Sequence, residues 1–314
     1  MKKRILVTGG AGFIGSAFVR LFAERYAITV VDKLTYAGKR SRLGAVKPKI
    51  EFIREDVGRP KEMAAIFKKK RFYAVVHFAA ETHVDKSLKD IQPFIQNNVL
   101  ATASLLTLTK KHRIQRFIHI STDEVYGERK KGGRFKESAP LKPRNPYAAT
   151  KAAAEFLVQA AIRRDKLPAI IARPANHYGP WQLPEKFIAV AITRLLAGKK
   201  IPVYGKGRQI REWLYVDDGA AAIELLLRKG KKGEIYNIGS SAERRNIDTA
   251  RLIGRLMGGK DPVRFVADRP GHDFRYGINC QNIRRLGWRP LTSFKNGLQQ
   301  TIHWYQNQAK GVFR

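Results

Sequence analysis

The sequence predicts an α/β fold, in which a doubly wound parallel sheet carries a second, smaller α/β lobe. Short apolar runs rich in β-branched residues alternate with helical stretches through the first half of the 314-residue chain. A glycine-rich segment separates the first apolar run from the first helical stretch. Beyond Pro174 the alternation loosens and prolines interrupt shorter elements. Strands that alternate with helices are typical of a parallel sheet covered by helices.

Six apolar runs are expected to form the strands of the main sheet: Arg4–Thr8, Ile28–Asp32, Ile50–Arg54, Tyr73–Phe78, Arg116–Ser121 and Ala169–Arg173. Tyr215–Ile238 repeats the pattern of strand, helix and strand, so we expect residues 214–240 to return to the first domain. The first domain is then residues 1–173 with 214–240. The smaller lobe comprises 174–213 and 241–314.

Composition excludes several classes of protein. Hydrophobic residues make up 44% of the chain, which is enough to form a core and argues against disorder. The single cysteine, Cys280, excludes an intrachain disulfide framework and a multi-cysteine zinc site. No apolar run has the length of a membrane span, so we expect a cytoplasmic protein without a membrane partner. The seven histidines show no metal-binding spacing, and no metal is expected.

The net charge is unusual, because 61 Lys and Arg oppose 26 Asp and Glu and leave +35. Three interpretations compete: nucleic-acid binding, binding to a polyanionic or membrane surface, and an enzyme of anionic substrates with a basic exterior. The basic clusters are spread along the chain, at 68–71, 110–113, 129–131 and 228–232. Because the clusters are spread out, we expect them to be solvated ends of helices. Nucleic acid remains a possible partner.

A dinucleotide site is indicated by the glycines after the first strand. Gly9, Gly12 and Gly15 have the spacing G-x-x-G-x-x-G, and the amphipathic stretch Ser16–Tyr26 follows. Glycine permits the tight turn, and the helix N-terminus attracts a pyrophosphate. Asp32 ends the second strand, where its carboxylate can bind an adenosine ribose and would repel a 2′-phosphate. NAD is therefore favoured over NADP, although the neighbouring Lys33 moderates that inference.

Candidate catalytic residues follow two later elements. Asn145-Pro146 predicts a helix start, which places Tyr147 and Lys151 four residues apart on one helix face. A lysine ammonium and an oxidised nicotinamide would favour the tyrosinate. Thr122, Asp123 and Glu124 follow the fifth strand at the edge where open α/β sheets bind ligands. If burial raises the pKa of one carboxyl, the pair supplies one acid and one base.

Together these motifs resemble the extended short-chain dehydrogenases/reductases of the NAD-dependent epimerase/dehydratase family, and within them the dTDP-glucose 4,6-dehydratases. The resemblance runs essentially from end to end. The acid pair Asp123-Glu124 is its most discriminating part, since related epimerases lack it. The other stretches that carry it are 8–15, 31–38, 79–85, 121–127, 147–151, 178–180, 185–187, 211–218 and 268–273.

This resemblance implies dehydration of a nucleoside diphosphate hexose, dTDP-glucose above others, to the 4-keto-6-deoxy sugar. Tyr147, aided by Lys151 and Thr122, would take the 4-hydroxyl proton while hydride moves from C4 to NAD. Glu124 would then remove the C5 proton as Asp123 protonates the departing C6 hydroxyl, after which hydride returns to C6. A 4-epimerase or decarboxylase that uses only the redox step is the nearest alternative. A polyanion-binding or RNA-binding protein on a degenerate dehydrogenase fold is the alternative from another class.

The resemblance also implies binding residues and a partner. The cofactor would contact residues around the glycine turn and after the next strands: Gly9, Gly12, Phe13, Ile14, Gly15, Asp32, Lys33, Asp56, Val57, Ala79, Ala80, Tyr147 and Lys151. Asp56 could meet the adenine amino group. The sugar nucleotide would contact residues mostly of the second lobe: His83, Asn176, Lys186, Pro202, Tyr204, Arg211, Asn246, Arg269 and His272. Helices within 92–111 and 152–164 would form a homodimer contact.

The chain departs from the family pattern at two positions. The family often has two asparagines before Tyr-Gly-Pro, where this chain has Asn176-His177. It also often has a histidine after the acid pair that matches Asp217-Asp218, where this chain has Gly219. Neither position lies on the implied path of protons or hydride. Both departures leave the nucleobase open among dTDP, UDP and CDP.

Overall fold

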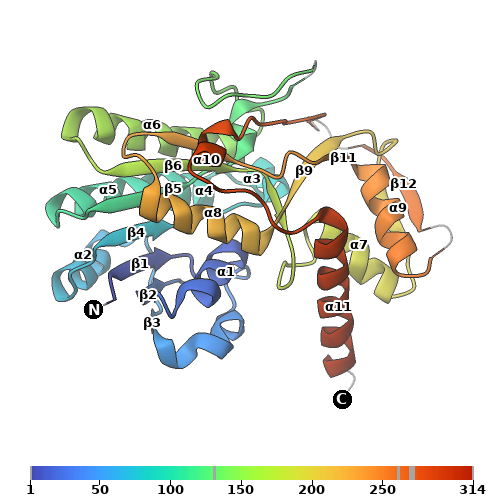
Figure 1. Ribbon diagram of the computed structural model, residues 1–314, viewed down its shortest axis with the longest axis horizontal. Helices are drawn as coiled ribbons and strands as arrows, with labels where there is room; N and C mark the ends of the chain where they lie inside the picture. The colour runs from blue at the N-terminus through green and yellow to red at the C-terminus, as the bar shows by residue number, and fades with distance from the viewer. Residues whose placement is uncertain (1, 130–131, 260–261, 269–272, 313–314) are drawn as a thin grey trace.

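The computed structural model contains a seven-stranded parallel sheet with helices on both faces and a second lobe beside one end (Figure 1). The structure describes residues 2–129, 132–259, 262–268 and 273–312. The strand order is β10-β6-β5-β4-β1-β2-β3, which confirms the predicted doubly wound α/β fold. These strands are β1 Arg4–Thr8, β2 Ala27–Val31, β3 Ile50–Ile53, β4 Ala74–His77, β5 Arg116–Ile120, β6 Ala169–Pro174 and β10 Ile235–Ile238.

Each of the six expected strands begins and ends within one residue of its predicted bounds. The seventh, β10, pairs in parallel with β6 at the sheet edge, so this segment returns to the main sheet. The expected strand at Tyr215 does not return with it. Tyr215 ends a strand of the second lobe, β9 Ile210–Tyr215, which pairs with β7 Asn176–Tyr178 and β11 Glu243–Arg245. The helix after β9 therefore makes the crossing between the two lobes.

Two helical layers cover the main sheet. On one face, α1 and α8 pack side by side over the cluster that includes Val7, Val30 and Ile223. On the other face, α2, α5 and α6 cover Leu6, Val75 and Phe117. Alternate residues of each strand thus point into opposite cores. The helical bounds are α1 Phe13–Phe22, α2 Pro60–Lys69, α3 Val84–Lys89, α4 Gln92–Phe94, α5 Ala101–Lys111, α6 Pro146–Asp165 and α8 Val216–Lys229, with 3₁₀ turns η1 Arg40–Lys49 and η3 Asp123–Tyr126 and the π-helical turn η2 Ile95–Leu100.

The second lobe has its own apolar core. Tyr178 lies at its centre, with edge-to-face ring contacts to Trp213, Tyr215 and Phe294. Such contacts stabilise aromatic clusters beyond the area they bury. Besides β7, β9 and β11, the lobe contains β8 Ile201–Tyr204, β12 Val263–Val266, α7 Phe187–Leu196, α9 Asn246–Leu256 and α11 Phe294–Val312. Helix α10 Gln281–Arg285 lies in the segment expected to belong to this lobe, but it packs against β10, and its Ile283 joins the core of the main sheet. In Figure 1, α7, α9 and α11 stand together beyond the end of the main sheet, and α10 lies back over it.

A buried ion pair fixes α6 to the sheet. The Arg173 guanidinium on β6 lies 2.5 Å from the Glu155 carboxylate on α6, and both side chains are fully enclosed. The same guanidinium donates hydrogen bonds to the Tyr126 hydroxyl at 2.7 Å and the Glu137 carbonyl oxygen at 3.0 Å. Buried ions are tolerated when they are paired and fully hydrogen-bonded in this way. The pair therefore sets the position of the helix that carries Tyr147.

We expect Arg173→Met to lower the free energy of unfolding by about 3–5 kcal/mol, because the Glu155 carboxylate would remain buried without its partner. The double variant Arg173→Met/Glu155→Leu should recover much of that loss, since both charges are then gone. Urea unfolding followed by circular dichroism measures both changes. Equal losses in the single and double variants would contradict this account of the pair.

Candidate active site

The glycine turn after β1 packs so closely that side chains are excluded. Gly9 has φ +68°, and a Cβ on it would lie 2.5 Å from the backbone nitrogen of Ala79 after β4. A Cβ on Gly15 would collide with the Gly9 carbonyl oxygen. Helix α1 begins at Phe13, earlier than the predicted Ser16, and no side chain caps its first turn. Its first amide groups therefore remain available to an anion.

Asp32 is held rigidly at the end of β2. Its carboxylate accepts hydrogen bonds from the backbone nitrogens of Ala11 at 2.9 Å and Leu34 at 2.8 Å. Burial raises the pKa of Asp32, while these two hydrogen bonds and the nearby Arg42 oppose that rise. A Cβ on Gly38 would come within 2.7 Å of the carboxylate, so the chain passes close beside it. Asp32 can thus accept hydrogen bonds at a fixed place next to the glycine turn.

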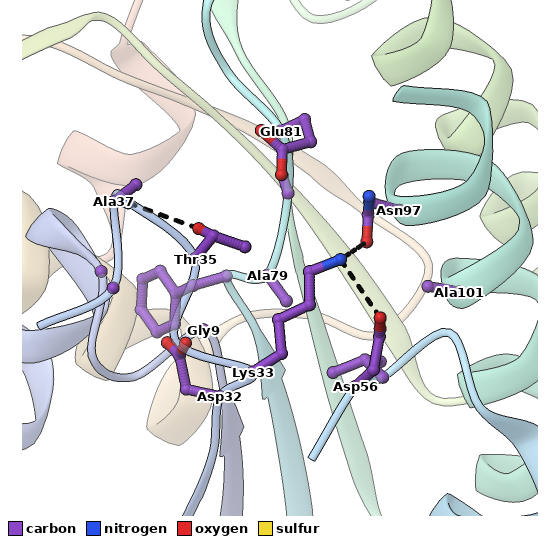
Figure 2. Close-up of a pocket in the computed structure, with 15 residues that line it drawn as sticks. Gly9, Asp32, Lys33, Thr35, Ala37, Asp56, Ala79, Glu81, Asn97 and Ala101 are labelled. Carbon is purple, nitrogen blue, oxygen red and sulfur yellow. Dashed lines mark hydrogen bonds and ion pairs between the residues drawn. The ribbon is translucent and has the colours of Figure 1, made fainter. Parts of the chain in front are cut away.

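A cleft opens at the carboxyl ends of β1, β2 and β4. This is the edge of the sheet at which open α/β folds bind ligands. Figure 2 shows Lys33 extending across it to hydrogen-bond Asp56 at 3.2 Å and Asn97 at 2.6 Å. Eight residues expected to bind the cofactor line this cleft: Gly9, Gly12, Asp32, Lys33, Asp56, Val57, Ala79 and Ala80.

Sequence reasoning did not assign the other residues that line the cleft, which are Thr35, Ala37, Gly38, Phe78, Glu81, Asn97 and Ala101. Phe78 and Glu81 adjoin assigned residues in the chain, and Thr35, Ala37 and Gly38 follow Lys33 closely, so the position of the strand ends could have found these five. Asn97 and Ala101 carry no such signal. They reach the cleft from η2 and α5, which follow β4.

The acid pair lies where β5 ends. Thr122 caps the 3₁₀ turn η3 by accepting a hydrogen bond from the Glu124 backbone nitrogen at 3.3 Å. Asp123 is only 1% exposed, and burial raises its pKa well above the ordinary value, with further rises from Glu124 and Glu212. Glu124 is half-buried and accepts a hydrogen bond from Asn145 at 3.1 Å. Burial therefore favours the protonated form of Asp123, which is the condition under which the pair can supply one acid and one base.

Helix α6 begins as predicted and brings Tyr147 and Lys151 to the acid pair. Asn145 caps the helix by accepting a hydrogen bond from the Ala148 nitrogen at 2.8 Å. The Lys151 ammonium donates to the Ile120 carbonyl oxygen at 2.6 Å, and burial lowers its pKa to about 8. A hydrogen bond with Thr122 lowers the pKa of Tyr147. Thr122, Asp123, Glu124 and Tyr147 are thus close enough to influence one another.

The net effect on Tyr147 differs from the expected one. Burial and the carboxyls of Glu124 and Asp123 raise the pKa of this phenol far more than Thr122 lowers it. The Lys151 ammonium, which was expected to stabilise the tyrosinate, donates its hydrogen bond to the backbone of β5. The neighbouring side chains therefore keep Tyr147 protonated, and lowering its pKa requires a positive charge brought by a ligand.

Asn98 is a further residue that sequence reasoning missed. It lies buried in the π-helical turn η2, and such turns often occur at functional sites. Its side-chain amide exchanges hydrogen bonds with the Glu81 backbone, at 2.8 and 3.1 Å, and donates to Thr150 at 2.9 Å. Asn98 thereby fixes the segment after β4 against the helix of Tyr147 and Lys151.

Residues 5–239 match the model of the NAD dependent epimerase/dehydratase family. The chain belongs to this family. It is 42% identical to the dTDP-glucose 4,6-dehydratase of Neisseria meningitidis serogroup B over 348 residues, which cover 99% of this chain and 98% of the relative. The crystal structure of the DesIV dTDP-glucose 4,6-dehydratase from Streptomyces venezuelae, with NAD and dTDP bound, matches with a TM-score of 0.94 at 42% identity and covers 98% of both chains. The NAD complex of Thermus thermophilus UDP-glucose 4-epimerase matches with a TM-score of 0.91 at 30% identity, covering 96% of this chain and 99% of that one.

NAD is the cofactor of this family, and the cleft fits it. The uncapped first turn of α1 can receive the pyrophosphate, and the tight turn before it forms only because Gly9 and Gly15 carry no Cβ atoms. The Asp32 carboxylate suits a ribose that carries free hydroxyls. Asp56, expected near the adenine, pairs with Lys33 and accepts a hydrogen bond from the Gly58 nitrogen at 2.8 Å. No cluster of metal-ligating side chains occurs among the described residues.

In this chain the second lobe contacts the first through residues that were expected to bind the sugar nucleotide. His83, which precedes α3, lies 3.8 Å from the Glu185 carboxylate, and Lys186 donates to the Thr82 carbonyl oxygen at 3.1 Å. Arg211 is buried on β9, where its guanidinium donates to the carbonyl oxygens of Ile210, Phe274 and Asp273. Pro202 and Tyr204 lie on β8. The expected Arg269 and His272 fall outside the described residues.

The side-chain oxygens of Asn176 and Asn246 are free to accept hydrogen bonds. The side-chain oxygen of each is buried and has no hydrogen-bond partner in the structure. Buried polar atoms usually have partners, so each of these unpaired oxygens is a candidate ligand contact. Asn176 begins β7, which pairs with β9, and Asn246 begins α9, where its backbone nitrogen donates to the Gln209 carbonyl oxygen just before β9.

The two departures from the family pattern form a matched pair. A Cβ on Gly219 would collide with the ring of His177, which is buried on β7 and donates a hydrogen bond from Nδ1 to the Ala175 carbonyl oxygen at 3.0 Å. Burial lowers the pKa of His177 to about 4, so the imidazole is neutral at pH 7. The His177 ring therefore occupies the space that any side chain at position 219 would need.

We expect Gly219→Ala to destabilise the protein by about 1–3 kcal/mol through overpacking, even though alanine favours a helix more than glycine does by about 1 kcal/mol. The double variant His177→Asn/Gly219→Ala should be more stable than Gly219→Ala alone, because the smaller asparagine removes the collision. Thermal or urea unfolding of the wild type, both singles and the double measures the coupling. Simple additivity of the two changes would contradict the pairing.

Proposed function

We propose that the chain is a dTDP-glucose 4,6-dehydratase, a hydro-lyase that converts dTDP-glucose to dTDP-4-keto-6-deoxyglucose. The observation that carries this proposal is the Asp123–Glu124 pair beside Tyr147 at the carboxyl end of β5. An enzyme that performs only a redox step at C4 has no use for an acid and a base next to its tyrosine. The 42% identity to dehydratases along the whole chain supports the same assignment.

Each side chain has one task in this reaction. Bound NAD supplies the reversible oxidation at sugar C4 and the reduction at C6. Tyr147 accepts the proton of the 4-hydroxyl, and Thr122 orients the phenol. The Glu124 carboxylate takes the proton from C5, which the 4-keto group acidifies, and returns a proton to C5 when C6 is reduced. Asp123, whose protonated form is favoured by burial, gives its proton to the 6-hydroxyl as the C6–O bond breaks and water leaves.

The two lobes divide the binding. Residues 1–173 with 214–240 bind NAD, and the lobe of 174–213 and 241–314 binds the sugar nucleotide. Asn176, Lys186 and Arg211 approach the diphosphate, for which the planar guanidinium fork of arginine is well suited. We assign Arg269 and His272 to the same wall, and Pro202 and Tyr204 to the nucleobase pocket. His83 and Asn246 complete the set of substrate contacts.

The direct test follows a deuterium label from sugar C4. A dehydratase moves the label to C6 of the product, where mass spectrometry or NMR detects it beside a 4-keto group. The family relative with epimerase activity suggests the alternative, a nucleotide-sugar 4-epimerase, which would leave the label at C4. Turnover of UDP-glucose or CDP-glucose in preference to dTDP-glucose would overturn the choice of nucleobase.

We expect Glu124→Gln to lower kcat for dehydration by about 100-fold or more, because the amide cannot accept the C5 proton. Binding of NAD and of dTDP, measured by calorimetry, should change less than threefold, since the amide keeps the shape of the side chain. Glu62→Gln on the exposed face of α2 serves as the matched control. Unchanged dehydration in Glu124→Gln would remove this residue from the base role.

We also propose that the protein acts as a cytoplasmic homodimer. Large apolar side chains are exposed along neighbouring helices, among them Leu100 on η2 and Phe156 on α6, each 58% exposed. These two elements pack side by side, so their outer faces form one apolar surface. A second copy of the chain would cover it in a symmetric helical contact. In the described part of the chain, every helix is too short or too polar to cross a bilayer.

We expect Phe156→Asp to shift the protein from dimer to a monomer of 35.6 kDa in light scattering after size-exclusion chromatography, because a charge would be buried in the contact. Leu291→Asp is the control, since Leu291 is 91% exposed to solvent and lies in the segment assigned to the second lobe. A wild-type protein that already runs as a monomer would contradict the proposed contact.

A further inference from the structure

One arginine is buried directly behind the NAD cleft. Arg42, in the 3₁₀ turn η1, is only 2% exposed. Its guanidinium donates hydrogen bonds to the carbonyl oxygens of Ala11 at 2.9 Å, Ala37 at 2.5 Å and Trp181 at 2.8 Å. Ala11 belongs to the glycine turn, Ala37 lines the cleft after β2, and Trp181 lies in the second lobe. A single side chain thus joins both walls of the cleft to the other lobe.

The Arg42 charge is held without a close carboxylate. Within the described residues no ion pair to Arg42 is formed, and Asp32 acts on it only over a longer distance. Arg20 adds a second guanidinium nearby, donating to the Arg42 carbonyl oxygen at 3.2 Å. Burying a cation among neutral carbonyls costs free energy. An anion bound at the first turn of α1, a few residues from Ala11, would offset part of that cost.

The acceptor in the second lobe is also held in an unusual state. Trp181 has φ +72°, a left-handed conformation that is strained for a bulky residue. Its ring packs on Trp304 of α11 at 5.0 Å, and Arg20 lies over it at 5.9 Å. The next residue, Gln182, accepts a hydrogen bond from Tyr305 of α11 and donates to the His177 carbonyl oxygen at 2.8 Å. The Trp181 carbonyl is therefore rigidly attached to the core of the second lobe.

The same contacts define the geometry of the cleft. Ala11 is held on both sides, through its nitrogen by Asp32 and through its oxygen by Arg42. Without the guanidinium, the turn and the Ala37 segment would lose their common support, and the two lobes would lose a buried polar contact. Loss of these hydrogen bonds would cost free energy, because the Arg42 side chain is enclosed and its contact with the Ala11 carbonyl oxygen is buried.

We propose that Arg42 is a positioning residue that couples NAD binding to the docking of the second lobe. NAD at the glycine turn favours the arrangement in which Arg42 holds Trp181, and a ligand of the second lobe favours the same arrangement. Each ligand therefore increases affinity for the other, as thermodynamic linkage requires. The half of this inference that concerns the second ligand rests on the proposed function. The half that concerns NAD rests on family membership alone.

The test compares Arg42→Met and Arg42→Lys with the wild type, and Arg40→Met is the control because Arg40 is an exposed cation of the same turn. Calorimetry measures the Kd of NAD with and without saturating dTDP. We expect Arg42→Met to weaken NAD binding about tenfold or more, with Arg42→Lys intermediate and Arg40→Met within twofold. In the wild type dTDP should tighten NAD binding about fivefold, and this ratio should fall to near one in Arg42→Met.

Further readouts separate positioning from a loss of fold. At saturating NAD, kcat in both variants should remain within about threefold of the wild type, since Arg42 touches no reacting atom. If Arg42→Met does not fold, Arg42→Lys decides, and NAD binding unchanged from the wild type overturns the proposal. Weakened NAD binding with the dTDP effect intact would overturn the coupling. Failure of dTDP to bind the wild type would count against the proposed function, while the NAD measurements still test Arg42.

Discussion

The site depends on the close backbone contact between the glycine turn and the segment after β4. Strands β1 and β4 are neighbours in the sheet, and the chain leaves them toward opposite helical layers. Gly9 lies against Ala79 so tightly that no Cβ fits between them. That contact opens the cleft on the cofactor side and directs the next segment toward Glu81 and Asn98. Through Asn98 it reaches Thr150, and so the helix that carries Tyr147. Cofactor cleft and catalytic helix are therefore parts of one rigid arrangement.

Burial is the dominant electrostatic influence at the catalytic residues, and its sign depends on the group. It raises the pKa of Asp123 and of Tyr147 and lowers that of Lys151, in each case disfavouring the charged form. The effect suits the acid role proposed for Asp123, which requires a bound proton. It opposes the base role proposed for Tyr147, which requires the loss of a proton. The phenol can act as a base only when a positive charge comes close, so its deprotonation depends on a bound ligand.

The sequence predicted the main sheet closely because its strands are buried on both faces and read as continuous apolar runs. The glycine turn and the acid pair were equally visible, since glycine spacing and adjacent carboxyls at a strand end carry a physical meaning on their own. The strand at Tyr215 was misplaced because strand propensity does not specify the sheet that a strand joins. The pKa of Tyr147 was misjudged because side-chain spacing shows neither burial nor the carbonyl to which Lys151 donates. Arg42 could not be separated from 60 other basic residues until its burial was known.

The interlocking of His177 and Gly219 also limits how such a site can have changed over time. If the chain began with the family's frequent asparagine at position 177 and histidine at position 219, either position could have changed first. Acquiring the strand imidazole first would force two rings into one volume, whereas losing the helix side chain first leaves only a void. Voids weaken a protein by an amount that many folds withstand, while overlapping atoms displace the backbone around them. The tolerated order therefore places glycine at position 219 first. Once His177 has filled the space, a side chain can return to position 219 only after His177 has been replaced.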